Sequence, residues 1–319
     1  MTDTTALTIG PLRVIVAAHD SAVHTALRSA YRAFAEEDLA VPHSLTAHVT
    51  YTSGPAPADW PFTFDEGVLR FTAPHCHGAI DLGHHTAQVA ITAPHPFEPI
   101  DYFVRTALAL LAFEAGGLLF HAAGLARHDR GYGFFGYSGS GKTTVARVSR
   151  DATILNDDLV VLLPQASYPA ARQASRSSPS VPPLAKRPAP RQASRPYGET
   201  GTGKRERGNG SADTGARTRE ADQWWISATP FSNPTQVMSA GPQSVPLAAL
   251  YRLVQDRSVF AEPIEPATAV AEIVASSPVV SADPDRALDL LARAAQLVSS
   301  VPVHRLHFLP DASFWNVIE

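Results

Sequence analysis

The chain has 319 residues, of which 45% are apolar and 18% charged, and its net charge at pH 7 is −4. This balance is typical of a globular protein of about two domains and excludes a wholly disordered chain. The single cysteine excludes a disulfide framework and a zinc site built on paired cysteines. The N-terminus shows no signal-peptide pattern, and every long apolar run is interrupted, so we expect a soluble, cytoplasmic protein without a membrane partner.

Short apolar runs separated by proline and glycine fill the first hundred residues. Their spacing predicts a helix over residues 21–35, with Asp20 as its N-cap. Residues 1–96 are therefore predicted to form a small α+β domain. The predicted strands cover residues 12–18, 47–51, 67–72 and 87–92.

Five residues in this region have side chains that soft metals prefer, but turn residues surround them and argue against a metal site. They are His75, Cys76, His77, His84 and His85.

From residue 97 onward, strands alternate with helices, which predicts an α/β core with a central sheet in residues 97–164 and 223–319. The predicted helices are a long one that ends at Gly116, a short one from Thr144, two at 266–275 and 284–299, and one after Asp311. The predicted strands cover residues 118–125, 132–135, 153–155, 159–163, 224–228, 248–254 and 303–309.

Residues 165–222 differ in composition from the rest of the chain. They contain 7 Pro, 6 Gly and 7 Ser but only two large aliphatic residues, so we expect a long disordered insertion. The insertion carries 11 basic and 5 acidic residues out of 26 and 30 in the chain, which gives it +6 and leaves −10 on the remainder. This negative remainder argues against nucleic acid as a partner.

Residues 136–143 fit the pattern G-x-x-x-x-G-K-[ST] of a phosphate-binding P-loop, between an apolar strand and a helix. The glycines let backbone N–H groups face a phosphate, and the following helix adds positive potential. Lys142 would meet the β- and γ-phosphates of ATP, and the Thr143 hydroxyl would ligate Mg²⁺. The predicted nucleotide-binding residues are Gly136, Ser138, Gly139, Ser140, Gly141, Lys142, Thr143 and Thr144.

A second glycine-rich stretch, residues 198–205, nearly repeats this pattern. It has Arg205 where the metal-ligating hydroxyl should stand, and it follows no apolar strand. We therefore do not expect Lys204 to bind nucleotide.

Two further features accompany the P-loop. Asp157 and Asp158 follow a short strand only 14 and 15 residues after Thr143, which suits a kinase, because such an acid can accept a proton from an acceptor hydroxyl or hold Mg²⁺. His121 lies 15 residues before Gly136, on the strand that precedes the P-loop strand. A turn near residues 129–131 would bring this histidine close to the phosphates.

His121, the P-loop and the early acid pair together resemble the HPr kinase/phosphorylase family, which is related in fold to the ATP-dependent phosphoenolpyruvate carboxykinases. The resemblance is specific over residues 118–163, and it implies a P-loop kinase core that uses ATP and Mg²⁺. Asp158 would be the general base toward a serine hydroxyl, Lys142 would bind the transferred phosphate, and His121 would assist. Thr143 and Asp157 would serve the metal.

The resemblance implies a protein or peptide substrate with an acceptor serine, and leaves a homo-oligomer open. Two other interpretations remain. One is a small-molecule P-loop kinase, for example of free serine, although no arginine-rich lid is recognisable. The other is a non-catalytic scaffold that binds ATP and docks a partner through its basic insertion.

The composition of the insertion makes a direct prediction about stability. Replacing residues 171–219 with a short Gly/Ser linker should lower the free energy of unfolding by about 1 kcal/mol or less, because loop-closure entropy changes slowly with length. The melting temperature measures this effect. A fall of many degrees would show that the segment packs on the body.

Overall fold

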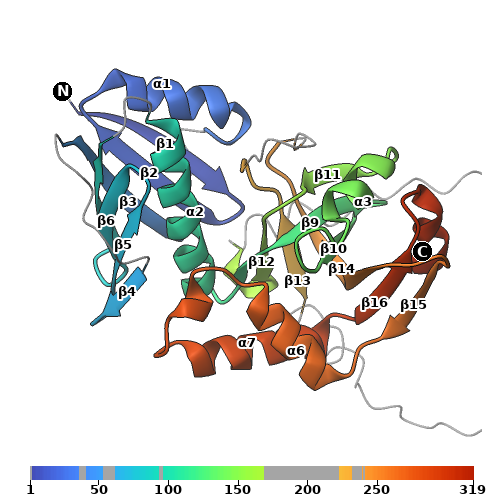
Figure 1. Ribbon diagram of the computed structural model, residues 1–319. Coiled ribbons are helices and arrows are strands. Elements are labelled where there is room, and N and C mark those ends of the chain that lie inside the picture. The colour runs from blue at the N-terminus through green and yellow to red at the C-terminus, as the bar shows by residue number, and fades with distance from the viewer. Residues whose placement is uncertain are drawn as a thin grey trace, which may run out of the picture.

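Two mixed β-sheets form the frame of the protein in the computed structural model (Figure 1). The structure describes residues 2–35, 41–52, 62–92, 96–168, 223–231, 239 and 241–319. The first sheet contains β1 (Asp3–Ile9), β2 (Leu12–Ala18), β3 (His43–Tyr51), β4 (Phe62–Asp65), β5 (Val68–Ala73), β6 (Cys76–Asp81) and β7 (Thr86–Ile91). The second contains β8 (Leu118–Phe120), β9 (Ala122–Arg127), β10 (Arg130–Phe135), β11 (Thr153–Asn156), β12 (Val160–Pro164), β13 (Trp224–Ser227), β14 (Ser244–Gln255), β15 (Phe260–Pro263) and β16 (Val303–Phe308). The described helices are α1 (Ser21–Ala30), α2 (Phe97–Glu114), α3 (Lys142–Val148), α6 (Pro266–Ala275), α7 (Ala287–Ser300) and α8 (Trp315–Ile318).

The first sheet has the strand order β1-β2-β3-β7-β6-β5-β4. β3 runs parallel to both of its neighbours, and the other pairs are antiparallel. The helix predicted next to this sheet is shorter than expected: α1 ends at Ala30 and a 3₁₀ turn follows. Its predicted N-cap is confirmed, because the Asp20 carboxylate accepts a hydrogen bond from the amide of Ala22 at 2.7 Å.

The second sheet has the order β11-β9-β10-β14-β13-β12-β8, with β16 beside β14 and β15 beside β16. The predicted strand over residues 118–125 is wrong in one respect: it is broken at His121 into β8 and β9. β8 pairs with β12, whereas β9 pairs with β10 and β11. The chain thus passes at His121 from β8, at one end of the sheet order, to β9, which is the second strand from the other end.

Helix α2 packs between the two sheets and joins their cores (Figure 1). Twelve of its 18 residues are buried, which is the pattern of a helix surrounded by apolar partners. Toward the first sheet, the rings of Phe103 and Phe71 stack with centroids 6.1 Å apart. Toward the second, Leu118 and Leu162 belong to the same apolar cluster as α2. None of the described helices combines the length and the apolar character that crossing a membrane would need.

The residues at the start of the predicted insertion require a correction. Ser167 and Tyr168 are buried, and the Tyr168 hydroxyl lies 2.8 Å from Oγ of Ser227. The Tyr168 ring also packs against that of Trp225, with centroids 5.5 Å apart. The body therefore extends to residue 168, because an aromatic ring and two hydroxyls offset the ordering of this short segment. The rest of the predicted insertion, with Lys204, lies outside the described residues.

The end of α2 makes a tight connection to β8. The amide of Gly117 donates to the carbonyl of Ala112 at 2.8 Å, and that of Gly116 donates to Phe113 at 3.0 Å. This is a Schellman motif with Gly116 at positive φ. A Cβ atom on Gly117 would lie 2.0 Å from the backbone oxygen of Leu162, so β12 can approach only a glycine here.

This contact predicts the effect of one methyl group. Gly117→Ala should lower the free energy of unfolding by about 1–3 kcal/mol or more, because the clash is with backbone. Gly83→Ala is the control, since its Cβ would lie 3.4 Å from Oδ1 of Asp81 and should change stability by about 0.5 kcal/mol or less. Urea unfolding measures both, and equal midpoints for the two variants would contradict the packing described.

Candidate functional site

The predicted P-loop follows β10 and leads into α3. Gly136, Gly139 and Gly141 have φ values of +147°, +79° and +110°, which residues with a Cβ rarely adopt. A Cβ on Gly141 would also lie 2.5 Å from the ring of Phe308, whereas none of the described atoms lies within 4 Å of one on Gly139. The Ser140 hydroxyl oxygen is buried and has no hydrogen-bond partner among the described residues. A curled loop with accessible backbone and an unsatisfied hydroxyl fits a phosphate ligand.

Lys142 lies across this loop. Its ammonium donates to the carbonyl of Gly136 at 2.9 Å and to that of Tyr137 at 3.3 Å. Burial lowers the pKa of Lys142, and the negative charge of Asp158 opposes this shift. The cation is therefore fixed at the loop and electrostatically coupled to the acid pair. Because α3 has only seven residues, the loop backbone and Lys142, rather than a long helix dipole, provide the positive potential.

Strand register brings His121 and the acid pair to the P-loop. A hairpin with a two-residue turn, His128 and Asp129 at positive φ, joins β9 to β10 and pairs Ala122 with Phe135. His121 and Gly136 are the next residues along this ladder. On the other side, β12 pairs Val160 with Phe120, so the residues before β12 also lie beside His121. The strand register therefore places His121 next to Gly136, the first residue of the predicted P-loop.

The Asp158 carboxylate lies between two basic side chains. Its Oδ1 is 3.1 Å from Nε2 of His121, and its Oδ2 is 3.5 Å from a guanidinium nitrogen of Arg105. The hydrogen bond from His121 lowers the pKa of Asp158; burial opposes this, and the charges of His121, Arg105 and Lys142 add to it. Asp158 is thus held as a carboxylate at neutral pH.

Asn156 fixes the turn that carries the acid pair. Its side-chain oxygen accepts the amides of Asp158 at 2.8 Å and Leu159 at 2.9 Å, and its amide nitrogen donates to the carbonyls of Thr229 and Phe231 at 3.1 and 2.7 Å. All four hydrogen-bonding positions of this buried amide are used. The segment that follows β13 therefore holds Asp158 in place.

The residues predicted to serve a metal differ in exposure. Asp157 is buried, whereas Thr143 is half-buried at the start of α3. Among the described residues, no three His, Cys, Asp or Glu side chains gather into a metal-binding group. Mg²⁺ typically takes one or two protein oxygens together with substrate phosphates and waters, and the Thr143 hydroxyl and Asp157 could serve in that way.

Sequence reasoning missed Arg105, Arg252 and Glu272. Arg105 on α2 binds Asp101 at 2.7 Å, and its guanidinium lies 4.6 Å from the ring centroid of Phe231. Arg252, near the end of β14, binds Glu272 of α6 at 3.0 Å and lies 4.9 Å from the ring centroid of Tyr137. A signal existed for Arg105: it is the only basic residue of a mainly apolar helix and is spaced i,i+4 from Asp101.

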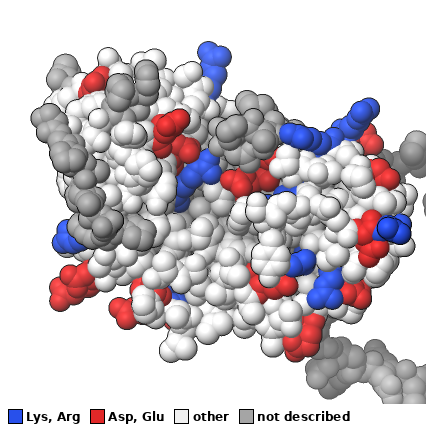
Figure 2. All heavy atoms as spheres, viewed as in Figure 1, with Lys and Arg blue, Asp and Glu red and all other residues white. Residues whose placement is uncertain are grey.

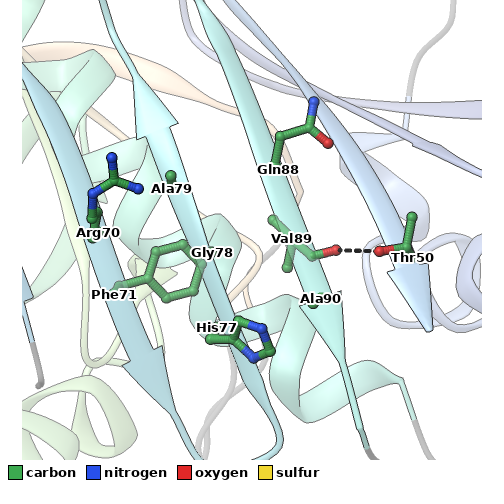
Figure 3. Close-up of a pocket in the computed structure, with 9 residues that line it drawn as sticks. All are labelled: Thr50, Arg70, Phe71, His77, Gly78, Ala79, Gln88, Val89 and Ala90. Atoms are coloured by element: carbon green, nitrogen blue, oxygen red, sulfur yellow. Dashed lines mark hydrogen bonds between the residues drawn. The ribbon is translucent and has the colours of Figure 1, made fainter. Parts of the chain in front are cut away.

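The cluster of histidines around Cys76 does not assemble a metal site in the described structure. Cys76 faces the core, where burial raises the pKa of its thiol to about 11. His77 lies on the opposite face of the sheet, where it lines a hollow of about 310 Å³ together with Arg70 and Gln88 (Figure 3). This hollow contains none of the predicted site residues.

The charged side chains on the face seen in Figure 2 are of mixed sign. Lys and Arg are interspersed with Asp and Glu, and the described residues of this face form no large patch of one sign. A phosphate backbone is usually met by clustered cations, so this face offers no support for nucleic acid as a partner.

Comparison with protein-family models and with curated proteins finds no match for this chain. Its function is therefore inferred from the geometry and chemistry of the described residues.

The pKa of Asp158 supplies a test of this geometry. His121→Ala should raise it toward its usual range, because the main hydrogen bond to the carboxylate is lost. Conversely, His84→Ala should raise the pKa of Asp81, which His84 lowers, and leave Asp158 unchanged. Carbon-13 NMR titration of the carboxyl groups measures both. A wild-type Asp158 that titrates at its usual value would contradict the cluster.

The same shift has a consequence for stability. Because the folded-state pKa is lowered, the stabilisation by Asp158 is fully present above the unfolded value of about 3.9. It is lost as pH falls through the folded-state pKa.

Proposed function

We propose that this protein is an ATP-dependent kinase of HPr kinase type that transfers the γ-phosphate to a serine hydroxyl of a protein or peptide. The observation that carries the proposal is the convergence of Lys142, His121 and Asp158 where β8, β10 and β11 end. An anion-binding loop beside an ionised carboxylate is what phosphoryl transfer to a hydroxyl requires. A P-loop kinase core is the fold this proposal implies.

In the proposed reaction, the P-loop backbone and Lys142 hold the phosphates. The Thr143 hydroxyl and Asp157 would hold Mg²⁺, which would neutralise the developing charge. Asp158 accepts the proton of the serine hydroxyl as the serine oxygen bonds to the γ-phosphorus. The bond between the γ-phosphorus and the oxygen that bridges it to the β-phosphate breaks at the same time. ADP leaves with the electron pair of that bond. His121 orients Asp158 through the 3.1 Å contact.

Arg105 also binds Asp158 and therefore helps to hold it for this step. A lowered pKa weakens a base, but it keeps Asp158 ionised and ready over the whole physiological range. Phosphoryl transfer tolerates a weak base, because positioning and charge stabilisation supply most of the rate.

Asp158→Asn separates chemistry from binding. It should leave ATP affinity within a few-fold and cut phosphoserine formation at least about a hundredfold, because a positioned base contributes roughly 10²- to 10⁴-fold. Asp157→Asn should instead change the Mg²⁺ dependence. Titration with a fluorescent ATP analogue and transfer of radiolabel from ATP to an array of serine peptides measure the two quantities.

Lys142→Ala and Lys204→Ala are the controls. The first should weaken nucleotide binding, and the second should change neither quantity. If Asp158→Asn retained full transfer and Asp157→Asn were inactive, the roles of base and metal-serving residue would be reversed. Activity of both variants would reject the proposed kinase, and ATP binding without transfer by the wild type would favour the scaffold.

A further inference from the structure

A pocket of about 320 Å³ opens beside the Asp158 carboxylate. Asp158, His121 and Arg105 line one side of it. The rest of the lining is mainly apolar and consists of Phe62, Tyr102, Leu119, Leu159, Pro278 and Val279, with Thr106 as its one other polar residue. The nucleotide loop contributes no residue to this lining. The pocket therefore reaches the proposed base from a side other than the P-loop.

Three separate parts of the chain build the apolar wall. Phe62 comes from β4 in the first sheet and stacks on Tyr102 of α2, with centroids 6.4 Å apart and planes 12° apart. Tyr102 is also in contact with Phe71 of the sheet core. Pro278 and Val279, between α6 and α7, also line the pocket. This segment lies against α2 (Figure 1). Because α2 is buried between the sheets, packing on both sides holds the pocket residues of this helix in place.

The turn after α6 is strained where it forms the wall. Val279 has φ +70° and ψ −63°, and the amide of Val280 donates to the carbonyl of Pro278 at 2.9 Å, which is a γ-turn of the rare positive-φ kind. A β-branched residue rarely adopts this conformation. The preceding carbonyl of Ser276 accepts the amide of His121 at 2.8 Å. The strained turn thus presents Val279 to the pocket, as ligand-binding segments often do, and the C-cap of α6 just before it anchors the histidine.

We infer that this pocket receives an aromatic or branched aliphatic side chain next to the acceptor serine in a peptide substrate. The inference rests on the proposed function. A hydroxyl within about 3 Å of Asp158 places the groups attached to it against the apolar wall. Burying a large apolar side chain there should raise the affinity for the peptide about 10- to 100-fold.

The same wall disfavours free serine as the acceptor. The ammonium and the carboxylate of free serine would lose their hydrating water against apolar side chains, which is unfavourable. The one arginine in the lining, Arg105, is engaged with Asp101 and Asp158. In a peptide, the residue beside the serine carries an apolar side chain in place of these charged groups, so no charge is desolvated. The pocket therefore favours a peptide over a free amino acid.

The test uses the full chain and two variants on one strand. Phe62 and Phe64 are both half-buried on β4, but only Phe62 lines the pocket, and Phe64 lies instead under Arg286. Acceptors are serine peptides with phenylalanine, leucine, alanine, glycine or glutamate at each flanking position, together with free L-serine. A second readout is ligand-observed NMR binding of N-acetyl-phenylalaninamide, which needs no catalysis.

We expect the wild type to prefer peptides with phenylalanine or leucine at one flanking position by at least tenfold in kcat/KM. Phe62→Ala should reduce this preference several-fold through KM and weaken binding of N-acetyl-phenylalaninamide. It should leave ATP affinity and the kinetics of glycine-flanked peptides unchanged. Phe64→Ala should behave like the wild type in every assay.

Other results separate the two proposals. Transfer without an apolar preference, or to free serine with equal kcat/KM, would overturn the pocket assignment and leave the kinase standing. Binding of N-acetyl-phenylalaninamide that depends on Phe62, with no transfer to any acceptor, would support the apolar site and reject the kinase. Absence of both binding and transfer would overturn both.

Discussion

The site depends on one carboxylate, that of Asp158, which three basic side chains surround. The Asp158 side chain is 25% exposed, and burying a charge to that extent is unfavourable unless partners compensate. His121 and Arg105 compensate directly and Lys142 through its charge. These groups come from the break between β8 and β9, from α2 and from the P-loop. Their positions are therefore coupled, because moving any one of them would leave a partly buried charge less compensated.

His121 occupies the position that makes this coupling geometrically simple. It lies where two antiparallel ladders end: β9 with β10, which leads into the P-loop, and β8 with β12, which follows the acid pair. Its own amide leaves both ladders and binds the carbonyl of Ser276. The break in the strand thus allows one histidine to lie beside both Asp158 and the start of the glycine-rich loop. It also links the end of α6 to the same point.

Much of this arrangement could be predicted, because it is local. His121, Lys142 and Asp158 lie within 38 consecutive residues, and a hairpin, a P-loop and a short helix bring them together. The partners from elsewhere could not be predicted. Asn156 is held by the carbonyls of Thr229 and Phe231, more than 70 positions away across the insertion. A periodic pattern contains no information about such pairings.

The errors in the first sheet have a different cause. β1, β4 and β6 were not predicted, and β4 is only four residues long. β1 begins with three polar residues, and β6 contains a glycine and two polar side chains, so neither has the aliphatic run that indicates a strand. Their position is set by neighbours instead: β6 pairs with β5 and β7 along its whole length. Tertiary pairing has overridden weak local preference.

The ion pairs on Asp158 leave room for a substrate. A carboxylate offers about four acceptor positions, and the contacts to His121 and Arg105 use one on each oxygen. A serine hydroxyl could therefore donate to Asp158 without displacing either partner, and the carboxylate would need no reorganisation before accepting the proton. Such preorganisation is where electrostatic catalysis gains most. The two contacts that lower the basicity of Asp158 also fix the orientation of its carboxylate. Phosphoryl transfer depends mainly on positioning and on charge stabilisation, so this orientation contributes more to the rate than a higher basicity would.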